Sequence, residues 1–329
     1  MRRNVRRFDR SGFILIVVLG AVVTLSALLF GFHHTMRTKL STAHSFYRAE
    51  QAWNCARAGV NIAVAAIRNS DDLLRDTRFS KLASGEKAIP VADGTCSVTI
   101  TEENGLLNVN RLRRDTGQLD RTRIDQFLRL IDLLNRHKTG AARIGYGIVP
   151  AIIDWVDPDT DVTHLAFVQR DNLGAEEDYY RTLDPPCGCA NAPVGSLEEL
   201  LRVRGVTPEM LGQLRDSLTT FGDGKVNVNA APKLVLECLH EQMSPAVVQM
   251  ILNRRRLKPF STIVELKEVS GMTDNVYQAI KETISTGGPG RYYRVISRGT
   301  ARDLSVTVEV VLQRNTQAGN VDILQYREL

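Results

Sequence analysis

Carboxylates concentrated between Asp154 and Asp178 are the residues with the clearest capacity for chemistry. Eight acidic side chains in this stretch are accompanied by one fixed positive charge, Arg170, so the local net charge is −7. Carboxylates at this density repel one another unless a cation compensates them, and crowded hard oxygen ligands favour Ca²⁺ over softer metals. The composition therefore predicts a cation site, with a solvated acidic loop as the alternative.

The spacing inside this stretch indicates which carboxylates would bind the ion. Asp157, Asp159 and Asp161 alternate as in the first half of an EF-hand loop. The pattern then fails, because Val162 stands in place of the glycine and Val168 in place of the bidentate glutamate. A calcium site must therefore recruit ligands from later in the stretch. The predicted metal ligands are Asp157, Asp159, Asp161, Glu176 and Asp178, around one or two Ca²⁺ ions.

The sequence offers no constellation typical of an enzyme. Serine is plentiful, but no G-x-S-x-G nucleophile motif and no Walker A lysine motif occur. The number of cysteines is odd, so at least one stays free or pairs between chains. The sequence leaves their pairing open, and they are Cys55, Cys96, Cys187, Cys189 and Cys238. We therefore expect a structural or binding protein, not an enzyme.

Two segments, 200–207 and 266–273, resemble helix-hairpin-helix units with a tight glycine turn between short helices. DNA-binding versions use a Gly-apolar-Gly turn whose free N–H groups hold a phosphate. Here Thr207 and Thr273 replace the second glycine, and four of the five net positive charges lie in the first twelve residues. We expect a packing motif and no nucleic-acid partner. A membrane-anchored helix-hairpin-helix DNA-binding protein of a DNA-uptake system is the alternative function.

The chain begins with a basic segment followed by an uncharged stretch from Phe13 to Phe32. At about 1.5 Å per residue, its roughly 20 residues span the hydrocarbon core of a membrane. The preceding positive charge predicts a cytoplasmic N-terminus, with the rest of the chain outside. A cleaved secretory signal and a plain membrane anchor are two interpretations. In the third, which we favour, Gly12-Phe13 resembles the cleavage site of prepilin peptidase, in a type IV pilin-like leader.

One residue of this leader departs from the pilin pattern. Pilin-like chains usually carry Glu as the fifth residue after the cut, where this chain has Val17. That Glu offsets the buried terminal amine of a neighbouring subunit, because an unpaired charge in lipid is costly. We therefore expect a subunit that sits at the end of a filament and does not form a homopolymer.

Hydrophobic periodicity predicts the elements that must position these residues. Apolar residues at alternating three- and four-residue spacing extend the first helix to about Asn69. A hairpin is expected over 94–107 with its turn at 103–105, and another over 292–312 with its turn near Gly299. Helices are expected within the ranges 120–137, 148–155, 196–214 and 231–284. The order of long helix, strands, helical block and strands predicts an α+β head with a helical insertion.

Four motifs carry a resemblance to a known family. They are Asp154-Trp155-x-Asp157-x-Asp159, the segment Gly174 to Tyr180, Asn108-x-Asn110, and Lys225-x-Asn227-x-Asn229-Ala-Ala-Pro232. Together with the leader they resemble the type II secretion system minor pseudopilin K family over most of residues 12–312. The resemblance implies a type IV pilin-like long N-terminal helix, a small antiparallel sheet and a large inserted helical (SAM-like/helix-hairpin-helix) domain. It also implies a structural subunit that caps the pseudopilus and binds calcium through the insert.

The predicted organisation divides the chain into five parts. They are a cleaved leader (1–12), a transmembrane part (13–32), a pilin-like helix with the first strands (33–110), the inserted helical domain (111–289), and the returning strands with a C-terminal tail (290–329). The expected location is the bacterial inner membrane, single-pass, with a periplasmic head. The expected partners are other minor pseudopilins at the filament tip, the inner-membrane assembly platform, prepilin peptidase and, through residues 13–32, the membrane.

Overall fold

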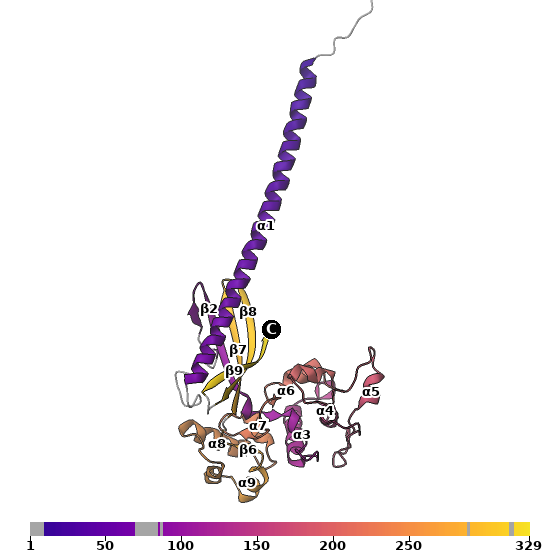
Figure 1. Cartoon of the computed structure of the whole chain (residues 1–329), viewed down its shortest axis with the longest axis vertical. Coiled ribbons are helices and arrows are strands. Elements are labelled where there is room, and N and C mark those ends of the chain that lie inside the picture. Colours follow the sequence, from indigo (N-terminus) through magenta and orange to yellow (C-terminus); the bar gives the residue numbers. More distant parts are fainter. Residues whose placement is uncertain (1–9, 70–84, 86–87, 288–289, 316–318) are drawn as a thin grey trace, which may run out of the picture.

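The computed structural model describes residues 10–69, 85, 88–287, 290–315 and 319–329. One long helix, α1 (Arg10–Asn69), projects from a head made of a sheet and a group of short helices (Figure 1). The C-terminal part of α1 lies across the sheet, and the helices lie beyond the end of the sheet that is remote from the tip of α1. This is the α+β arrangement that the sequence predicts.

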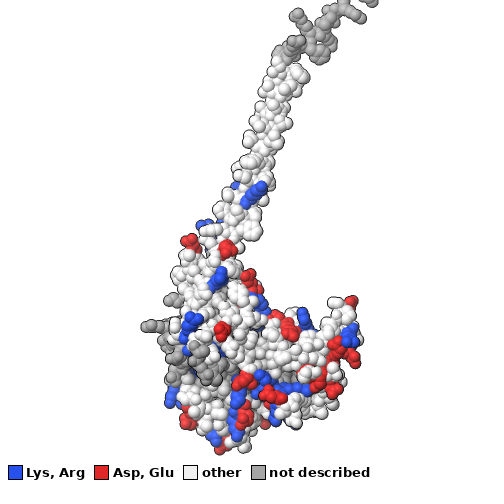
Figure 2. Space-filling model, viewed as in Figure 1, with Lys and Arg blue, Asp and Glu red and all other residues white. Residues whose placement is uncertain are grey.

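Helix α1 has two halves of different character. Its apolar side chains from Phe13 to Phe32 are exposed, and the first charged residue after Arg10 is Arg37. The free shaft is therefore without charged side chains over most of its length (Figure 2). By length and hydropathy, the helix contains a segment apolar enough to cross a membrane. The predicted end near Asn69 is confirmed.

The second half of α1 packs on a five-stranded antiparallel sheet. The strand order is β1-β2-β7-β8-β9, from β1 (Ile89–Val91), β2 (Gly94–Glu102), β7 (Gly290–Ala301), β8 (Leu304–Asn315) and β9 (Asn320–Glu328). Helix residues at three- and four-residue spacing are buried on it: Ala52, Ala56, Val60, Ala63 and Ile67. Valines of three strands complete this core, Val98, Val295, Val308 and Val310. Burial of this aliphatic face stabilises the docked helix.

Two predicted turns are wrong. The turn at 103–105 does not fold β2 back on itself; it is a 3₁₀ turn (Glu103–Gly105) that sends the chain into the helical region, and β2 pairs instead with β1. Strand β7 continues through Gly299 and turns at Arg302, which has φ +55°. Gly299 is a glycine because α1 lies directly on it, and a methyl group there would overlap the backbone of Ala52 and Ala56.

The helical region consists of two modules built on one plan. Each contains a parallel pair of two-residue strands, a 3₁₀ turn, a glycine turn and a closing helix. The first module contains β3 (Leu107–Asn108), 3₁₀ turns (Val109–Arg111, Gly140–Ala142, Leu197–Arg202), α3 (Arg121–Asn135), α4 (Ile148–Val156), α5 (Glu177–Arg181), α6 (Pro208–Leu214) and β4 (Leu218–Thr219). The second contains β5 (Val226–Asn227), α7 (Lys233–Cys238), α8 (Pro245–Leu257), a 3₁₀ turn (Ile263–Glu268), α9 (Asp274–Ile280) and β6 (Ile284–Ser285). Both modules lie within the predicted insert, apart from the first few residues of the first.

The same asparagine motif holds each module together. Asn110 Nδ2 donates to the carbonyl oxygens of Val194 (3.0 Å) and Thr220 (3.1 Å), while its Oδ1 accepts from Val194 N (2.8 Å). Asn229 makes the matching bonds in the second module, to the carbonyl oxygens of Phe260 (2.9 Å) and Thr286 (3.0 Å) and from Phe260 N (2.8 Å). The Asn-x-Asn segments are thus the structural centre of each repeat.

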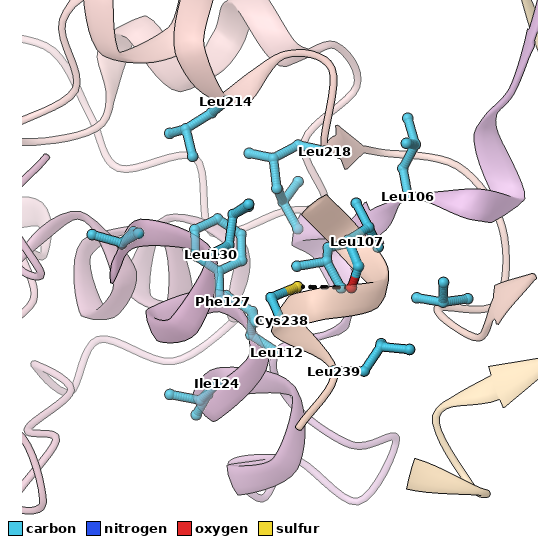
Figure 3. Close-up of a cluster of buried hydrophobic side chains, with 14 of the residues drawn as sticks. Leu106, Leu107, Leu112, Ile124, Phe127, Leu130, Leu214, Leu218, Cys238 and Leu239 are labelled. Carbon is cyan, nitrogen blue, oxygen red and sulfur yellow. Dashed lines mark hydrogen bonds between the residues drawn. The ribbon is translucent and has the colours of Figure 1, made fainter. Parts of the chain in front are cut away.

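A continuous apolar core joins the two modules. In the close-up, Phe127 and Leu130 of α3 lie near Leu214 and Leu218 of the first module and Cys238 of the second (Figure 3). Because the side chains of both modules fill one core, the modules are held as a single helical unit.

Ion pairs and a hydrogen bond attach this unit to the sheet. Arg294 Nε of β7 lies 2.8 Å from Glu103 Oε1, and both side chains are at least nine-tenths buried. Arg215, just after α6, lies 3.0 Å from Glu309 of β8. Asn227 Nδ2 of the second module donates to Glu102 Oε1 at the end of β2 (2.7 Å). Each module therefore has its own polar contact with the sheet.

Candidate metal centre in the first module

The acidic residues are positioned by the end of α4 and the loop that follows it, residues 157–176, called here the acidic loop. Asp157 caps α4, its N–H donating to Ile153 O (3.0 Å). The loop then doubles back through bonds from Leu165 N to Asn172 O and from Gly174 N to Thr163 O (both 2.9 Å). This reversal returns Glu176 to the side of α4.

Three of the predicted ligands meet at this point. Carboxylate oxygens of Asp157, Asp159 and Glu176 lie within 4.8 Å of one another. Asp157 and Glu176 are 3% and 4% exposed, while the Asp159 side chain is 43% exposed. The cluster is therefore a buried pair of carboxylates with a third at its mouth, which is a geometry that a hard cation with oxygen ligands can occupy.

Asp154 is a fourth carboxylate beside the cluster, which the sequence analysis counted in the acidic stretch and in a family motif but not among the predicted ligands. It is fully buried, and its Oδ1 accepts from Thr163 N (2.9 Å) while its Oδ2 has no hydrogen-bond partner among the described residues. Gly174 makes room for it, because a methyl group there would overlap the Asp154 carboxylate. One signal for this role was its position three residues before Asp157, on the last turn of a helix.

One arginine, Arg113, lies against the cluster, and its charge does not balance the carboxylates gathered there. Arg113 Nη2 lies 2.5 Å from Asp157 Oδ2, and Arg113 Nη1 lies 3.0 Å from Asp159 Oδ2. The first contact is an ion pair without good hydrogen-bond geometry, and the second is also a hydrogen bond. Among the described residues, Asp157 Oδ1 and both oxygens of Glu176 also lack a hydrogen-bond donor. Sequence reasoning missed Arg113, which lies outside the acidic stretch.

The pKa values of the two buried carboxyls, Asp157 and Glu176, are raised. Burial, opposed by Arg113 and reinforced by Asp159, raises the pKa of Asp157 to about 7. Burial and the neighbouring Asp154 raise the pKa of Glu176 to about 7, although the Cys189 thiol and the Glu177 backbone lie close enough to lower it in part. Orphaned, desolvated carboxylate oxygens are what a divalent cation would satisfy, so the residues present fit a Ca²⁺ site.

The other two predicted ligands lie outside this group. Asp161 is exposed, and its backbone N donates to Asp159 Oδ1 (2.9 Å), which holds the turn. Asp178 is exposed in the first turn of α5. Their participation in metal binding stays a prediction.

The segment from Cys189 to Asn191 is bonded to residues at and beside the cluster. Cys189 N donates to Glu177 Oε2 (2.8 Å), and Asn191 Nδ2 donates to Asp159 O (2.9 Å). Burial, together with Glu176 and Asp154, raises the pKa of the Cys189 thiol to about 11, so it remains protonated. Its Sγ donates to Asp154 O (3.5 Å), and the ligand atoms that meet at the cluster are carboxylate oxygens, which suit a hard cation.

The two glycine turns have the predicted shape. Gly205 and Gly271 have φ of +81° and +88°. Thr207 and Thr273, which follow, accept from the backbone N of Met210 and Val276 (both 3.3 Å) and begin α6 and α9. The threonines thus occupy N–H groups that a DNA-binding turn leaves free for phosphate.

The predicted processing site lies at the start of α1. Residues 1–9 of the predicted leader are outside the described part of the chain, and α1 begins at Arg10. Phe13 is 70% exposed on the helix. Cleavage between Gly12 and Phe13 stays a prediction.

The comparisons with known proteins agree with one another. Two sequence profiles described as type II secretion system (T2SS), protein K match residues 105–223 and 226–287, together more than half of the chain, and their border falls between the two modules. The chain is 24% identical to type II secretion system protein K of Pseudomonas aeruginosa over 322 residues, spanning 94% of this chain and 90% of that protein. It is also similar in fold to a chain of the crystal structure of the GspK-GspI-GspJ complex from the enterotoxigenic Escherichia coli type 2 secretion system. That match has a TM-score of 0.66 and 19% identity, and it covers 89% of this chain and 99% of that one.

Proposed function

The chain belongs to the type II secretion system protein K family, and we propose that it acts as a minor pseudopilin at the tip of the periplasmic pseudopilus. The role is structural: the subunit assists assembly of the filament and export of proteins across the outer membrane. The observation that carries this proposal is the division of α1. Its first half is uncharged and exposed, and its second half is docked on the sheet, so the helix can join a membrane or a helical filament core while the head remains outside.

The position at the tip is supported by the residue at Val17. A repeating subunit needs a carboxylate there to offset the terminal amine of its neighbour, and this chain offers an apolar side chain that is 54% exposed. The large helical head also extends well beyond the sheet, which favours a terminal position over one enclosed by further subunits (Figure 1).

The proposed partners are other minor pseudopilins, in line with the complex to which the fold is similar. The proposed location is the inner membrane, single-pass, with the N-terminus in the cytoplasm and the head in the periplasm. Prepilin peptidase and the inner-membrane assembly platform are the proposed partners during processing and assembly. The DNA-uptake alternative has no support, since Thr207 and Thr273 cap their helices.

Within this role we propose that Asp157, Asp159 and Glu176 hold a Ca²⁺ ion, with Asp161 and Asp178 as further ligand candidates. The ion would supply the positive charge that Arg113 alone does not, and so fix the acidic loop against α4. Its contribution is to the shape and stability of the first module.

Processing and secretion in the native bacterium test the proposed function. In a strain lacking the gene, exported enzymes should accumulate in the periplasm, and the full chain should restore their release. Gly12→Leu should block cleavage and complementation, whereas Gly20→Ala, at a helix position with open space around it, should not. Mass spectrometry should give Phe13 as the N-terminus of the restored protein. Full secretion by uncleaved Gly12→Leu would contradict the pilin-like role.

A further inference from the structure

We propose that Cys55 of α1 and Cys96 of β2 form a disulfide bond that fastens the membrane-anchored helix to the sheet. Both residues are thiols in the structure, at 4% and 0% exposure, and they come from elements 41 positions apart in the sequence. The inference rests on the proposed periplasmic location of the head, because disulfides form and persist in such oxidising compartments.

The first step of the argument is the close approach of α1 to the sheet. Gly299 of β7 lies beneath the turn of α1 from Ala52 to Ala56, which contains Cys55, and a methyl group on it would come 2.9 Å from the Cys55 carbonyl carbon. Cys96 is the direct cross-strand partner of Gly299 in the β2–β7 ladder. Direct partners in an antiparallel ladder point to the same face of the sheet, so Cys96 faces α1 beside this contact.

Two further glycines bring the sulfur atoms into the same interface. A methyl group on Gly94, two residues before Cys96 on the same face of β2, would lie 2.7 Å from Cys55 Sγ. A methyl group on Gly59, one helical turn after Cys55, would lie 3.3 Å from Cys96 Sγ. Cys55 Sγ thus lies against Gly94, on the strand of Cys96, and Cys96 Sγ lies against Gly59, on the helix of Cys55. The two thiols are close enough that Cys55 contributes to raising the pKa of Cys96.

The remaining cysteines show no such pairing. Cys238 is buried in the helical head, where its Sγ donates to Val235 O at 3.1 Å (Figure 3). Cys187 is exposed and Cys189 partly buried, both at the edge of the acidic loop and both part of the helical unit. Among the five, Cys55 and Cys96 are therefore the pair whose linkage would connect two elements distant in sequence.

The chemistry is thiol–disulfide exchange with an oxidised dithiol donor of the compartment. One cysteine thiolate attacks the donor disulfide, giving a mixed disulfide and releasing one donor thiol. The second thiolate then displaces the other donor sulfur, so the chain loses two protons and two electrons and the donor gains two thiols. Once α1 has docked on the sheet, burial raises the pKa of both thiols, so we expect the bond to form during docking and to resist reductants afterwards.

Peptide mapping of the full chain, extracted in detergent from cells with a periplasmic thiol-oxidising system, tests the inference. Free thiols are blocked with iodoacetamide under denaturing conditions before digestion with trypsin. Cleavage at Arg48, Arg57, Lys87 and Arg111 isolates the two cysteines in peptides 49–57 and 88–111. We expect these peptides as one linked species that separates on reduction. The same link should persist in a variant with Cys187, Cys189 and Cys238 all changed to Ala, and should vanish in Cys55→Ala.

Protease treatment of spheroplasts separates failure of this inference from failure of the proposed location. If the head is digested from outside and both peptides nevertheless carry iodoacetamide, the inference is overturned while the location stands. If the head is protected, the location fails, and the purified reduced chain is refolded with oxidised glutathione instead. Linked peptides then support the pairing, and alkylated peptides overturn it.

Discussion

The two modules of the helical unit share a frame and differ in what fills it. In both, the second asparagine of an Asn-x-Asn segment bonds three backbone groups, and a glycine turn with a threonine cap begins the last helix. In the first module the acidic loop and α5 lie between α4 and the 3₁₀ turn Leu197–Arg202, whereas in the second only residues 258–262 separate α8 from the 3₁₀ turn Ile263–Glu268. The asparagine bonds and the glycine–threonine turns therefore make the shared frame, and the acidic loop is an addition to the first module.

The added loop changes the electrostatics of only one module. In the second, Arg255 Nη1 donates to the carbonyl oxygens of Val228 and Ala231 (both 2.8 Å), so this half-buried cation has its hydrogen-bond partners within the module. In the first, Asp157 and Glu176 are buried with too few partners. The first module should therefore respond to cations and lose stability as pH rises, whereas the second should not respond to cations.

The largest expected effect tests the shared frame. Asn110→Ala and Asn229→Ala each remove three hydrogen bonds and leave backbone groups unpaired, so each should lower the free energy of unfolding by about 3 kcal/mol. Denaturant unfolding of the detergent-solubilised chain measures this. Asn253→Ala, on the surface of α8, is the control and should cost little. Equal losses of stability in the Asn110 and Asn229 variants would support a frame shared by both modules. A loss in only one variant would contradict it.

The second prediction sharpens the contrast between the modules. Ca²⁺ at 100 times its dissociation constant should add about 2.7 kcal/mol to the stability of the first module. Hydrogen exchange should show the gain in residues 154–178 and little change in the second module. Mg²⁺ should do less, because it demands tighter octahedral coordination. Identical exchange in chelator and in millimolar Ca²⁺ would show that the loop is only an acidic surface.

Single substitutions then assign the ligands. Asp157→Ala and Asp159→Ala should abolish the Ca²⁺ response, since both belong to the cluster. Asp161→Ala and Asp178→Ala test the two predicted ligands that lie outside it, and the position of these residues favours a smaller loss. Glu265→Ala, in the second module, is the matched acidic control and should leave the response unchanged. Calcium titration by calorimetry measures each variant.

Sequence reasoning succeeded where the signal was local or the motif was specific. Periodicity located the end of α1 at Asn69, and an amphipathic stretch opened by Asp120 located α3, whose Arg123 N bonds to that cap. The family predicted from four motifs is confirmed by the profile matches and by the Pseudomonas aeruginosa relative. Caps and helical periods depend on neighbours within one turn, which a sequence displays directly.

The failures concern contacts between distant residues. Gly299 suggested a turn, but it marks the approach of α1, from about 240 positions earlier in the chain. Arg113 forms an ion pair with Asp157 of the acidic cluster, and nothing in the local spacing connects these two residues. Strand β9 was expected to be a tail, because an edge strand with Ile323 and Leu324 both half-exposed lacks the alternation of a buried strand.

The smallest expected effect is the pH dependence of the first module without metal. Asp157 and Glu176 have a pKa of about 7 in the fold, above their ordinary values near 4, so the folded state binds more protons than the unfolded state between these limits. In chelator, the contribution of these two carboxyls to stability should therefore be greatest below about pH 4 and be lost as pH rises through 7, by on the order of 1 to 2 kcal/mol, because the exposed mouth of the cluster at Asp159 lets solvent screen the charges. In Ca²⁺ the direction should reverse, because the ion must displace these protons and binds more weakly as pH falls.

Buried Glu103 also has a raised pKa and adds the same trend to global unfolding, so local hydrogen exchange of residues 154–178 is the required measurement. Asp157→Asn mimics the protonated acid, and it should flatten the pH profile in chelator while also removing the Ca²⁺ response. The second module is a reference with the opposite trend, because burial and Arg129 lower the pKa of His240, so its contribution to stability rises with pH, while Arg255, whose pKa burial lowers to about 10, remains charged throughout this range. A pH profile that is the same for both modules would refute the view that the acidic loop alone sets them apart.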